Sequence, residues 1–139
     1  MTEANQFTPT YNLVCLSDTE EISYCCRMNN KQSNSKIIYL TTNKRVKTTL
    51  EEEGVQSIFL IKPNQKISIP FQEHIKQSFI FEHGLLSTSL LLQFLNVHVS
   101  CPITVLTNSH YYPIEMYQKL GANHVKYLEL EEDVNYLFM

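Results

Sequence analysis

The stretch ITVLTNSHYYPIEMYQKLGANHVKYLEL, residues 103–130, contains a predicted strand, a helix and a second strand in succession. Ile103–Thr107 and His124–Leu128 are short runs rich in β-branched and apolar residues, typical of strands covered on both faces. Pro113 suits the first turn of the helix between them, and Gly121 suits its end. Apolar side chains recur at helical spacing along this helix, and we expect them to share one face: Ile114, Tyr117 and Leu120. The pattern predicts two parallel strands joined by a right-handed crossover.

The same alternation of short apolar runs and helical segments extends over most of the chain. Four further runs carry the strand signature: Tyr11–Leu16, Lys36–Leu40, Ser57–Ile61 and Ser78–Phe81. Strands that alternate with helices indicate an α/β fold with a parallel sheet. We therefore predict a Rossmann-like, doubly wound parallel sheet of six strands in the order 3-2-1-4-5-6, with the first strand between the second and the fourth.

Residues that cap helices follow three of these strands. After the first strand, Ser17 and Glu20 have the spacing of a capping box, in front of a helix that would place three side chains on one face: Ile22, Cys25 and Cys26. After the second strand, Thr42 or Asn43 can cap a helix that carries Val46 and Leu50 inward and ends at Gly54. After the fourth strand, we expect a hydroxyl residue to cap the next helix: Ser87, Thr88 or Ser89.

The segment from Lys62 to Gln77 has the weakest pattern in the chain. Pro70 can begin a single helical turn that continues through Phe71 and Ile75. The rest of this segment is predicted to be an irregular crossover between the third and fourth strands.

The composition is that of an ordinary globular protein. The chain has 139 residues and a net charge of −3, with 43% hydrophobic residues, which suits one domain with its own core. We expect a flexible tail over residues 1–10 and a single domain over residues 11–139. The negative charge disfavours nucleic acid as a partner. The sequence shows no signal peptide and no apolar run long enough to span a bilayer, so we expect a cytoplasmic protein without membrane insertion.

Two segments of the chain resemble the RCK domain, also called the KTN or TrkA-N domain, a regulatory module of potassium channels and transporters. In that family, the helix after the fifth strand ends in Leu/Ala-Gly-Ala, followed by Asp/Asn-x-Val; the matching residues here are Leu120, Gly121, Ala122, Asn123, His124 and Val125. The stretch NKRVKTTLEEEG, residues 43–54, resembles the helix after the family's second strand. The resemblance implies a regulatory role in a potassium channel or transporter assembly. It also implies a homodimer formed through helices, with three candidate contact residues: Tyr112, Met116 and Tyr117.

The chain departs from this family where nucleotide-binding members carry Gly-x-Gly-x-x-Gly after the first strand. The loop here runs from Leu16 to Glu21 as LSDTEE and contains no glycine. Side chains would stand where the pyrophosphate should lie, and three acidic residues would repel it: Asp18, Glu20 and Glu21. The acidic residue that binds ribose hydroxyls is also missing, and its place is taken by Thr41, Thr42 and Asn43. We therefore expect no NAD or ATP cofactor.

A second resemblance, over residues 79–108, is to the receiver domain of response regulators. Glu82 falls at the position of the phosphoacceptor aspartate, and Thr107 falls at the position of the switch threonine. Tyr127-Leu128 replaces the Lys-Pro that follows the last strand in that family, and a five-stranded receiver would leave Tyr11–Leu16 surplus. The alternatives are therefore a receiver-like signalling domain that is not phosphorylated, or a small NAD-dependent α/β enzyme.

No group of residues in the sequence indicates catalysis. Gly-x-Ser-x-Gly is absent, and the five histidines lack metal-ligand spacing, so we expect neither an enzyme nor a metal site. Ligands of α/β folds bind at the carboxyl ends of the strands. The candidate ligand-binding residues are those that follow the predicted strands: Ser17, Asp18, Thr19, Thr41, Thr42, His83 and Thr107.

Overall fold

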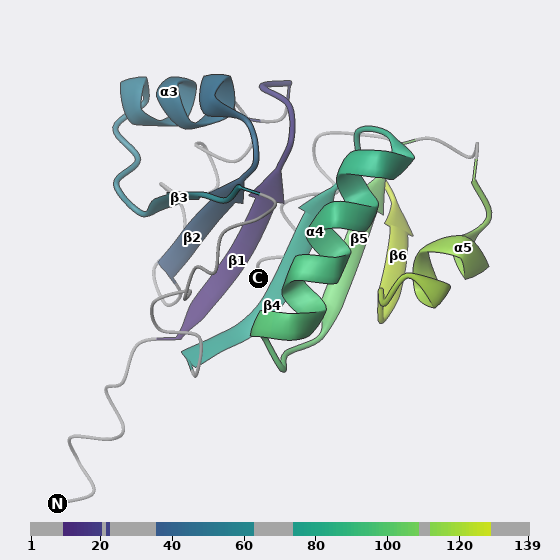
Figure 1. Cartoon of the computed structure of the whole chain (residues 1–139). Helices are drawn as coiled ribbons and strands as arrows, with labels where there is room; N and C mark the ends of the chain where they lie inside the picture. The colour runs from purple at the N-terminus through teal and green to yellow at the C-terminus, as the bar shows by residue number, and fades with distance from the viewer. Residues whose placement is uncertain (1–9, 21, 23–35, 63–73, 109–111, 129–139) are drawn as a thin grey trace, which may run out of the picture.

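The computed structural model describes residues 10–20, 22, 36–62, 74–108 and 112–128. These residues form a six-stranded sheet in the order β3-β2-β1-β4-β5-β6, and each neighbouring pair of strands is parallel. Figure 1 shows this twisted sheet, with α4 lying in front of β4 and β5. The predicted α/β class and strand order are confirmed.

Most of the predicted strand bounds agree with the structure to within a residue. The strands are β1 (Tyr11–Leu16), β2 (Lys36–Thr41), β3 (Ile58–Leu60), β4 (Ile75–Phe81), β5 (Ile103–Thr107) and β6 (His124–Tyr127). The helices are α3 (Lys44–Glu52), α4 (Leu85–His98) and α5 (Ile114–Lys119). Within the described ranges, no helix combines the length and the apolarity needed to cross a membrane.

The structure corrects the predicted helical turn that was to run from Pro70 through Ile75. Ile75 is buried and begins β4, where it lies opposite Tyr11 of β1. Pairing with the central strand therefore extends β4 three residues further back than the apolar run from Ser78 indicated. Pro70 and Phe71 lie outside the described residues, as do Cys25 and Cys26 of the helix expected after β1.

β1 occupies the centre of the sheet. It pairs with β2 as far as Leu16 opposite Thr41, and with β4 as far as Cys15 opposite Ile80. All six of its residues are buried, as expected for a strand that is paired on both edges and covered on both faces. The prediction that the first strand lies between the second and the fourth is confirmed.

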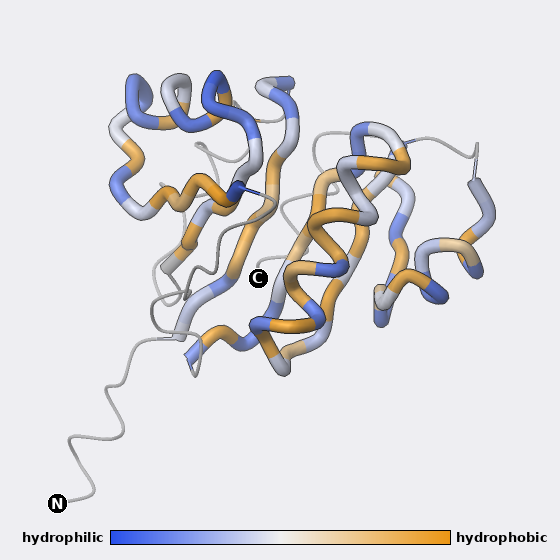
Figure 2. The backbone as a smooth tube through the Cα atoms, viewed as in Figure 1, coloured by the Kyte–Doolittle hydropathy of each residue, from blue (hydrophilic) through white to orange (hydrophobic). Residues whose placement is uncertain are grey.

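Alternate residues of β1 belong to two separate cores, one on each face of the sheet. Val14 and Leu16 pack with the buried face of α3, Val46 and Leu50. Leu13 and Cys15 pack with the buried side chains of α4 and α5: Leu91, Leu92, Leu95 and Tyr117. Because successive strand residues point to opposite faces, α3 covers one face and α4 and α5 cover the other. Figure 2 shows that the apolar residues concentrate along these strands and along α4.

The predicted ends of α3 are confirmed. Asn43 Oδ1 accepts a hydrogen bond from the Arg45 amide (2.9 Å) at the start of the helix. At the other end Gly54 has a φ of 87°, and the amides of Gly54 and Val55 donate to carbonyls of the last helical turn (3.0 and 3.1 Å). This is a Schellman motif, in which glycine supplies the positive φ. α5 ends in the same way at Gly121, whose φ is 117°.

The predicted start of α4 was wrong. The N-cap is Gly84, with a φ of 94°, and its amide donates to Glu82 Oε1 (3.0 Å). The three hydroxyl residues expected as caps lie inside the helix instead: Ser87, Thr88 and Ser89. A glycine with positive φ makes the turn out of β4, so the helix can begin before the first hydroxyl.

α5 buries less of its apolar face than its spacing predicted. Tyr117 is fully buried, but Ile114 and Leu120 are 36% and 38% exposed. The helix has six residues, less than two turns, so only one of the three side chains reaches the sheet.

Substitution of glycine should be most costly at position 121. A Cβ there would overlap the side-chain amide of Asn96, which donates to the Leu92 carbonyl (2.8 Å). Gly54 has a similar positive φ but open space around it. We expect Gly54→Ala to lower the free energy of unfolding by about 1 kcal/mol and Gly121→Ala by about 2–3 kcal/mol, measured by urea denaturation.

The double variant G121A/N96A is the control. If the overlap causes the extra loss, removing the Asn96 amide should return part of it. Equal losses for Gly54→Ala and Gly121→Ala would contradict this explanation of the α5 end.

Candidate functional site

The carboxyl ends of the parallel strands form one edge of the sheet, and most of the predicted site residues lie just beyond these ends. The loop after β1 stands between β2 and β3 on one side and β4, β5 and β6 on the other. This is the topological switch point, where doubly wound folds bind ligands. The loops after β1, β2, β4 and β5 therefore determine what this edge can hold.

The loop after β1 is closed by its own side chains. Asp18 Oδ1 accepts a hydrogen bond from the Glu20 amide (3.0 Å), and the Ile22 amide donates to the Thr19 carbonyl (3.2 Å). The capping-box spacing predicted that Ser17 would accept the Glu20 amide. That prediction was wrong, because Asp18 accepts it. Ser17 Oγ is buried, with no hydrogen-bond partner among the described residues.

The residues after β2 are tied to the loop after β1. Thr41 is buried, and its Oγ1 accepts from the Asn43 amide (3.1 Å). Asn43 Nδ2 in turn donates to the Ser17 carbonyl (3.3 Å). One amide side chain therefore holds the start of α3 and the loop at the switch point together.

The residues after β4 and β5 form a second hydrogen-bonded group. Glu82 accepts the Gly84 amide on Oε1 (3.0 Å) and the Thr107 hydroxyl on Oε2 (3.1 Å). The Glu82 amide also donates to the Leu106 carbonyl (2.8 Å). Both carboxylate oxygens are thus engaged within the protein, and Thr107 is held in a buried position.

The fold brings together three side chains that the sequence did not group. Asp18, Glu20 and His83 each offer a ligand atom, and these atoms lie within 4.8 Å of one another. His83 Nε2 lies 3.8 Å from Glu20 Oε2 across the switch point. Two carboxylates and an imidazole are a donor set that divalent cations accept. The sequence signal was weak, because His83 is more than sixty residues from the two acids.

Tyr117 contributes a buried phenol beside this edge. Burial, and after it the nearby Glu82 carboxylate, raise the pKa of Tyr117 above the usual range of a tyrosine. Its ring meets that of Tyr112 edge to face, with centroids 6.4 Å apart. The phenol therefore stays neutral at physiological pH and adds no charge near Glu82.

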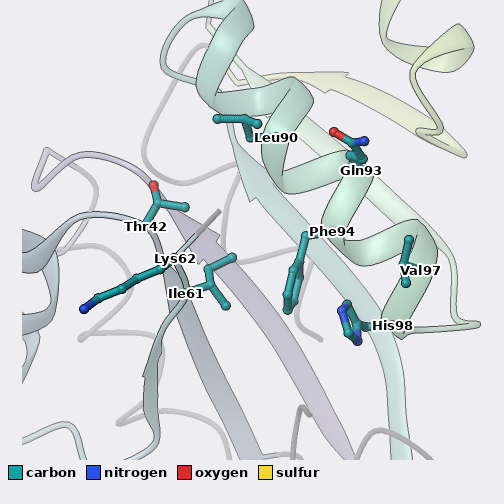
Figure 3. Close-up of a pocket in the computed structure, with 8 residues that line it drawn as sticks. All are labelled: Thr42, Ile61, Lys62, Leu90, Gln93, Phe94, Val97 and His98. Atoms are coloured by element: carbon teal, nitrogen blue, oxygen red, sulfur yellow. The ribbon is translucent and has the colours of Figure 1, made fainter. Parts of the chain in front are cut away.

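Thr42 does not join the other candidates. It is exposed and lines a separate cavity of about 250 Å³ between the ends of β2 and β3 and one flank of α4. Figure 3 shows Ile61 and Phe94 pointing toward one another in this cavity, with Lys62 on the opposite side from α4. The structure therefore divides the predicted site residues between the switch point, the group around Glu82, and this cavity.

Comparison with known proteins identifies the fold but no family. No family model matches the sequence, and no curated protein matches it significantly. Solved structures do match. The TrkA-N domain of the inner membrane protein ybaL from Escherichia coli has a TM-score of 0.60 at 14% identity, over 94% of this chain and 96% of that one. The GsuK channel bound to NAD has a TM-score of 0.56 at 12% identity, but the match covers 90% of this chain and only 24% of the channel chain.

Receiver-like structures match at a similar level. A structure of the P1 domain of CheA3 in complex with CheY6 from R. sphaeroides has a TM-score of 0.53 at 11% identity, over 94% of this chain and 95% of that one. The strands β2-β1-β4-β5-β6 have the 2-1-3-4-5 order of CheY. The strand in excess is thus β3 at the edge, and the expectation that Tyr11–Leu16 would be surplus was wrong. The matches show a Rossmann-like α/β fold similar to that of RCK domains, and five of its six strands have the order found in receivers.

The bond between Thr107 and Glu82 should stabilise the edge measurably. Thr107→Val removes the donor and leaves the carboxylate without its partner, so we expect a loss of about 1–2 kcal/mol in the free energy of unfolding. Thr107→Ser keeps Oγ and should lose less. Chemical denaturation of both variants checks this. Because valine keeps the methyl group and serine keeps the hydroxyl, a larger loss in Thr107→Ser than in Thr107→Val would show that the methyl group, not the bond, matters.

Proposed function

We propose that this chain is a non-catalytic regulatory domain of RCK type whose switch-point loop does not accept a dinucleotide. The observation that carries the proposal is the hydrogen bond from the Glu20 amide to Asp18 Oδ1. Dinucleotide-binding folds leave such amides free for the pyrophosphate and use glycines to let it approach. Here a carboxylate takes the amide, and the exposed Asp18 and Glu20 carry negative charge where the phosphates would lie.

The regulatory part of the proposal rests on how the edge uses its polar groups. Glu82 accepts hydrogen bonds from the Gly84 amide and the Thr107 hydroxyl, so both of its carboxylate oxygens are used to hold the loops after β4 and β5 together. The resemblance to the RCK family implies a potassium channel or transporter as the physiological context, and the likeness to a domain of the inner membrane protein ybaL and to the GsuK channel supports a membrane-protein assembly of this kind. A small ligand would contact the residues that border the switch point: Ser17, Asp18, Thr19 and His83.

The proposal predicts that nucleotides leave the stability of the protein unchanged. A ligand that binds only the folded state adds roughly 2.7 kcal/mol at a hundredfold excess over its dissociation constant. Millimolar NADH or ATP should therefore not move the melting temperature, measured by differential scanning fluorimetry.

The variant Asp18→Arg tests whether any effect of NADH on the melting temperature arises at this loop. A rise of several degrees with NADH that Asp18→Arg abolishes would overturn the proposal and restore a nucleotide site at this loop. A small NAD-dependent enzyme, one of the alternatives, would bind its cofactor through the same amides. The same rise in melting temperature would therefore favour that alternative.

A receiver-like signalling domain is the second candidate, favoured by the bond from Thr107 Oγ1 to Glu82 Oε2. Resemblance to receivers places these residues at the switch threonine and the phosphoacceptor. Asp18 and Glu20 follow the neighbouring β1, and together with His83 their ligand atoms lie within 4.8 Å of one another. Glu82 would then stand permanently in place of a phosphorylated aspartate, consistent with a domain that takes no phosphate.

The variant Glu82→Asp separates the two candidates. In a receiver-like site, acetyl phosphate with Mg²⁺ would transfer its phosphoryl group to the new aspartate carboxylate, releasing acetate. The RCK-type proposal predicts no phosphorylation of wild type or variant by mass spectrometry. Labelling of Glu82→Asp that disappears in the double variant E82D/D18N would favour the receiver instead.

A further inference from the structure

The cavity between the ends of β2 and β3 and the flank of α4 is separate from the switch point. Its volume is about 250 Å³, and none of the residues of the loop after β1 or of the group around Glu82 lines it. Thr42, which directly follows β2, is the one candidate ligand-binding residue from the sequence that lies there. The cavity therefore needs an explanation of its own.

The walls of the cavity are apolar. Ile61 and Phe94 point toward one another across it (Figure 3). Ile61 is buried, and the half-buried Phe94 packs against the same hydrophobic core. Leu90 and Val97 continue the apolar wall along α4. Apolar walls with a few polar groups at the rim are typical of sites for small molecules.

A second ring holds Phe94 in place at the cavity. The His98 imidazole lies one turn further along α4, with its centroid 4.2 Å from that of the Phe94 ring and an angle of 31° between the ring planes. Residues four positions apart lie on the same side of a helix, so both rings stay at the cavity. They form an aromatic wall before any ligand arrives, against which another ring can stack.

The ionisable groups around the cavity are all basic. Lys62 and His98 line it, and no Asp or Glu is found among the lining residues within the described part of the chain. The whole chain has the opposite excess, 14 acidic against 11 basic side chains. Figure 3 shows the ammonium end of Lys62 extending away from the cavity. Because this side chain is exposed and its four-carbon stem is flexible, it can swing over the opening to meet an anion.

The size of the cavity limits the ligand to a small molecule. An apolar cavity of about 150 Å³ accommodates benzene, whereas sites for drug-sized molecules have roughly 300–1,000 Å³. The volume here, about 250 Å³, lies between these values and suits one aromatic ring with a short side chain.

We propose that this cavity binds a small aromatic carboxylate, with its ring between Ile61 and Phe94 and its carboxylate at Lys62. The ring would displace water from the apolar walls, and the ammonium group would pair with the single negative charge. The Thr42 hydroxyl, on the same side of the cavity as Lys62, offers a further donor to the carboxylate. This site goes beyond the proposed function, because it uses none of the residues at the switch point.

A titration of the ¹⁵N-labelled full chain with 3-phenylpropionate tests the proposal. The amides of Lys62, Phe94 and His98 should show saturable shifts, with a dissociation constant of about 0.1–1 mM for a ligand of this size. The amides of Thr19 and Gly84, at the switch point, should keep their shifts. 3-Phenylpropylamine has the same ring and chain length but a positive charge, so it should bind at least about fivefold more weakly.

The variant Lys62→Glu tests the role of charge at an exposed position. It should weaken 3-phenylpropionate at least about fivefold and strengthen 3-phenylpropylamine. Lys126→Glu is the matched control, because it makes the same change at an exposed position on β6, at the opposite edge of the sheet from β3. It should leave the affinity for both probes unchanged. Phe94→Ala removes the aromatic wall and should weaken both probes, and thermal melts should confirm that each variant folds.

Four results would overturn the proposal. One is the absence of saturable shifts up to about 10 mM 3-phenylpropionate. A second is equal affinity for the acid and the amine, because the charge at the rim would then select nothing. A third is adenosine 5′-monophosphate shifting the same amides at lower concentration than 3-phenylpropionate, which would make the cavity part of a nucleotide site. The fourth is a shift of Thr19 and Gly84 without Phe94 and His98, which would place the carboxylate at the switch point.

Discussion

The burial of β1 on both faces and along both edges is the constraint on which the rest of the structure depends. Leu13 and Cys15 anchor the core under α4 and α5, whereas Val14 and Leu16 anchor the core under α3. Removing this strand would separate the two halves of the sheet, because β2 and β4 each pair with β1 and are not neighbours in the strand order. The chain leaves β1 at the switch point, so the residues after Leu16 determine which ligands this edge of the sheet can bind.

The loop that leaves Leu16 is built from side chains instead of glycines. The three glycines of the chain, Gly54, Gly84 and Gly121, all have positive φ and all stand at helix ends. Each is required there by the backbone, which leaves none for a phosphate-binding turn. The edge is held by hydrogen bonds within the protein, which the side chains of Asp18, Asn43 and Glu82 make to backbone groups of these loops.

The sequence predicted the features that depend on local pattern and missed those that depend on distant contacts. Continuous apolar runs indicated the strands and their order, and Asn43 and Gly54 indicated the ends of α3. The start of α4 was missed because a glycine turn at Gly84, not a hydroxyl, begins it. The approach of His83 to Asp18 and Glu20 could not be predicted from spacing, since only the pairing of β1 with β4 brings them together.

The central claim is that the Asp18 carboxylate closes the loop after β1 to a dinucleotide. The most direct measurement is a titration of ¹⁵N-labelled protein with NADH, observed through the backbone amide resonances of this loop and of Gly84. If the loop is closed, the amides of Asp18, Thr19, Glu20 and Gly84 keep their chemical shifts up to millimolar NADH. Saturable shifts confined to these amides would contradict the claim, because they would place the pyrophosphate where Asp18 is bound to the Glu20 amide.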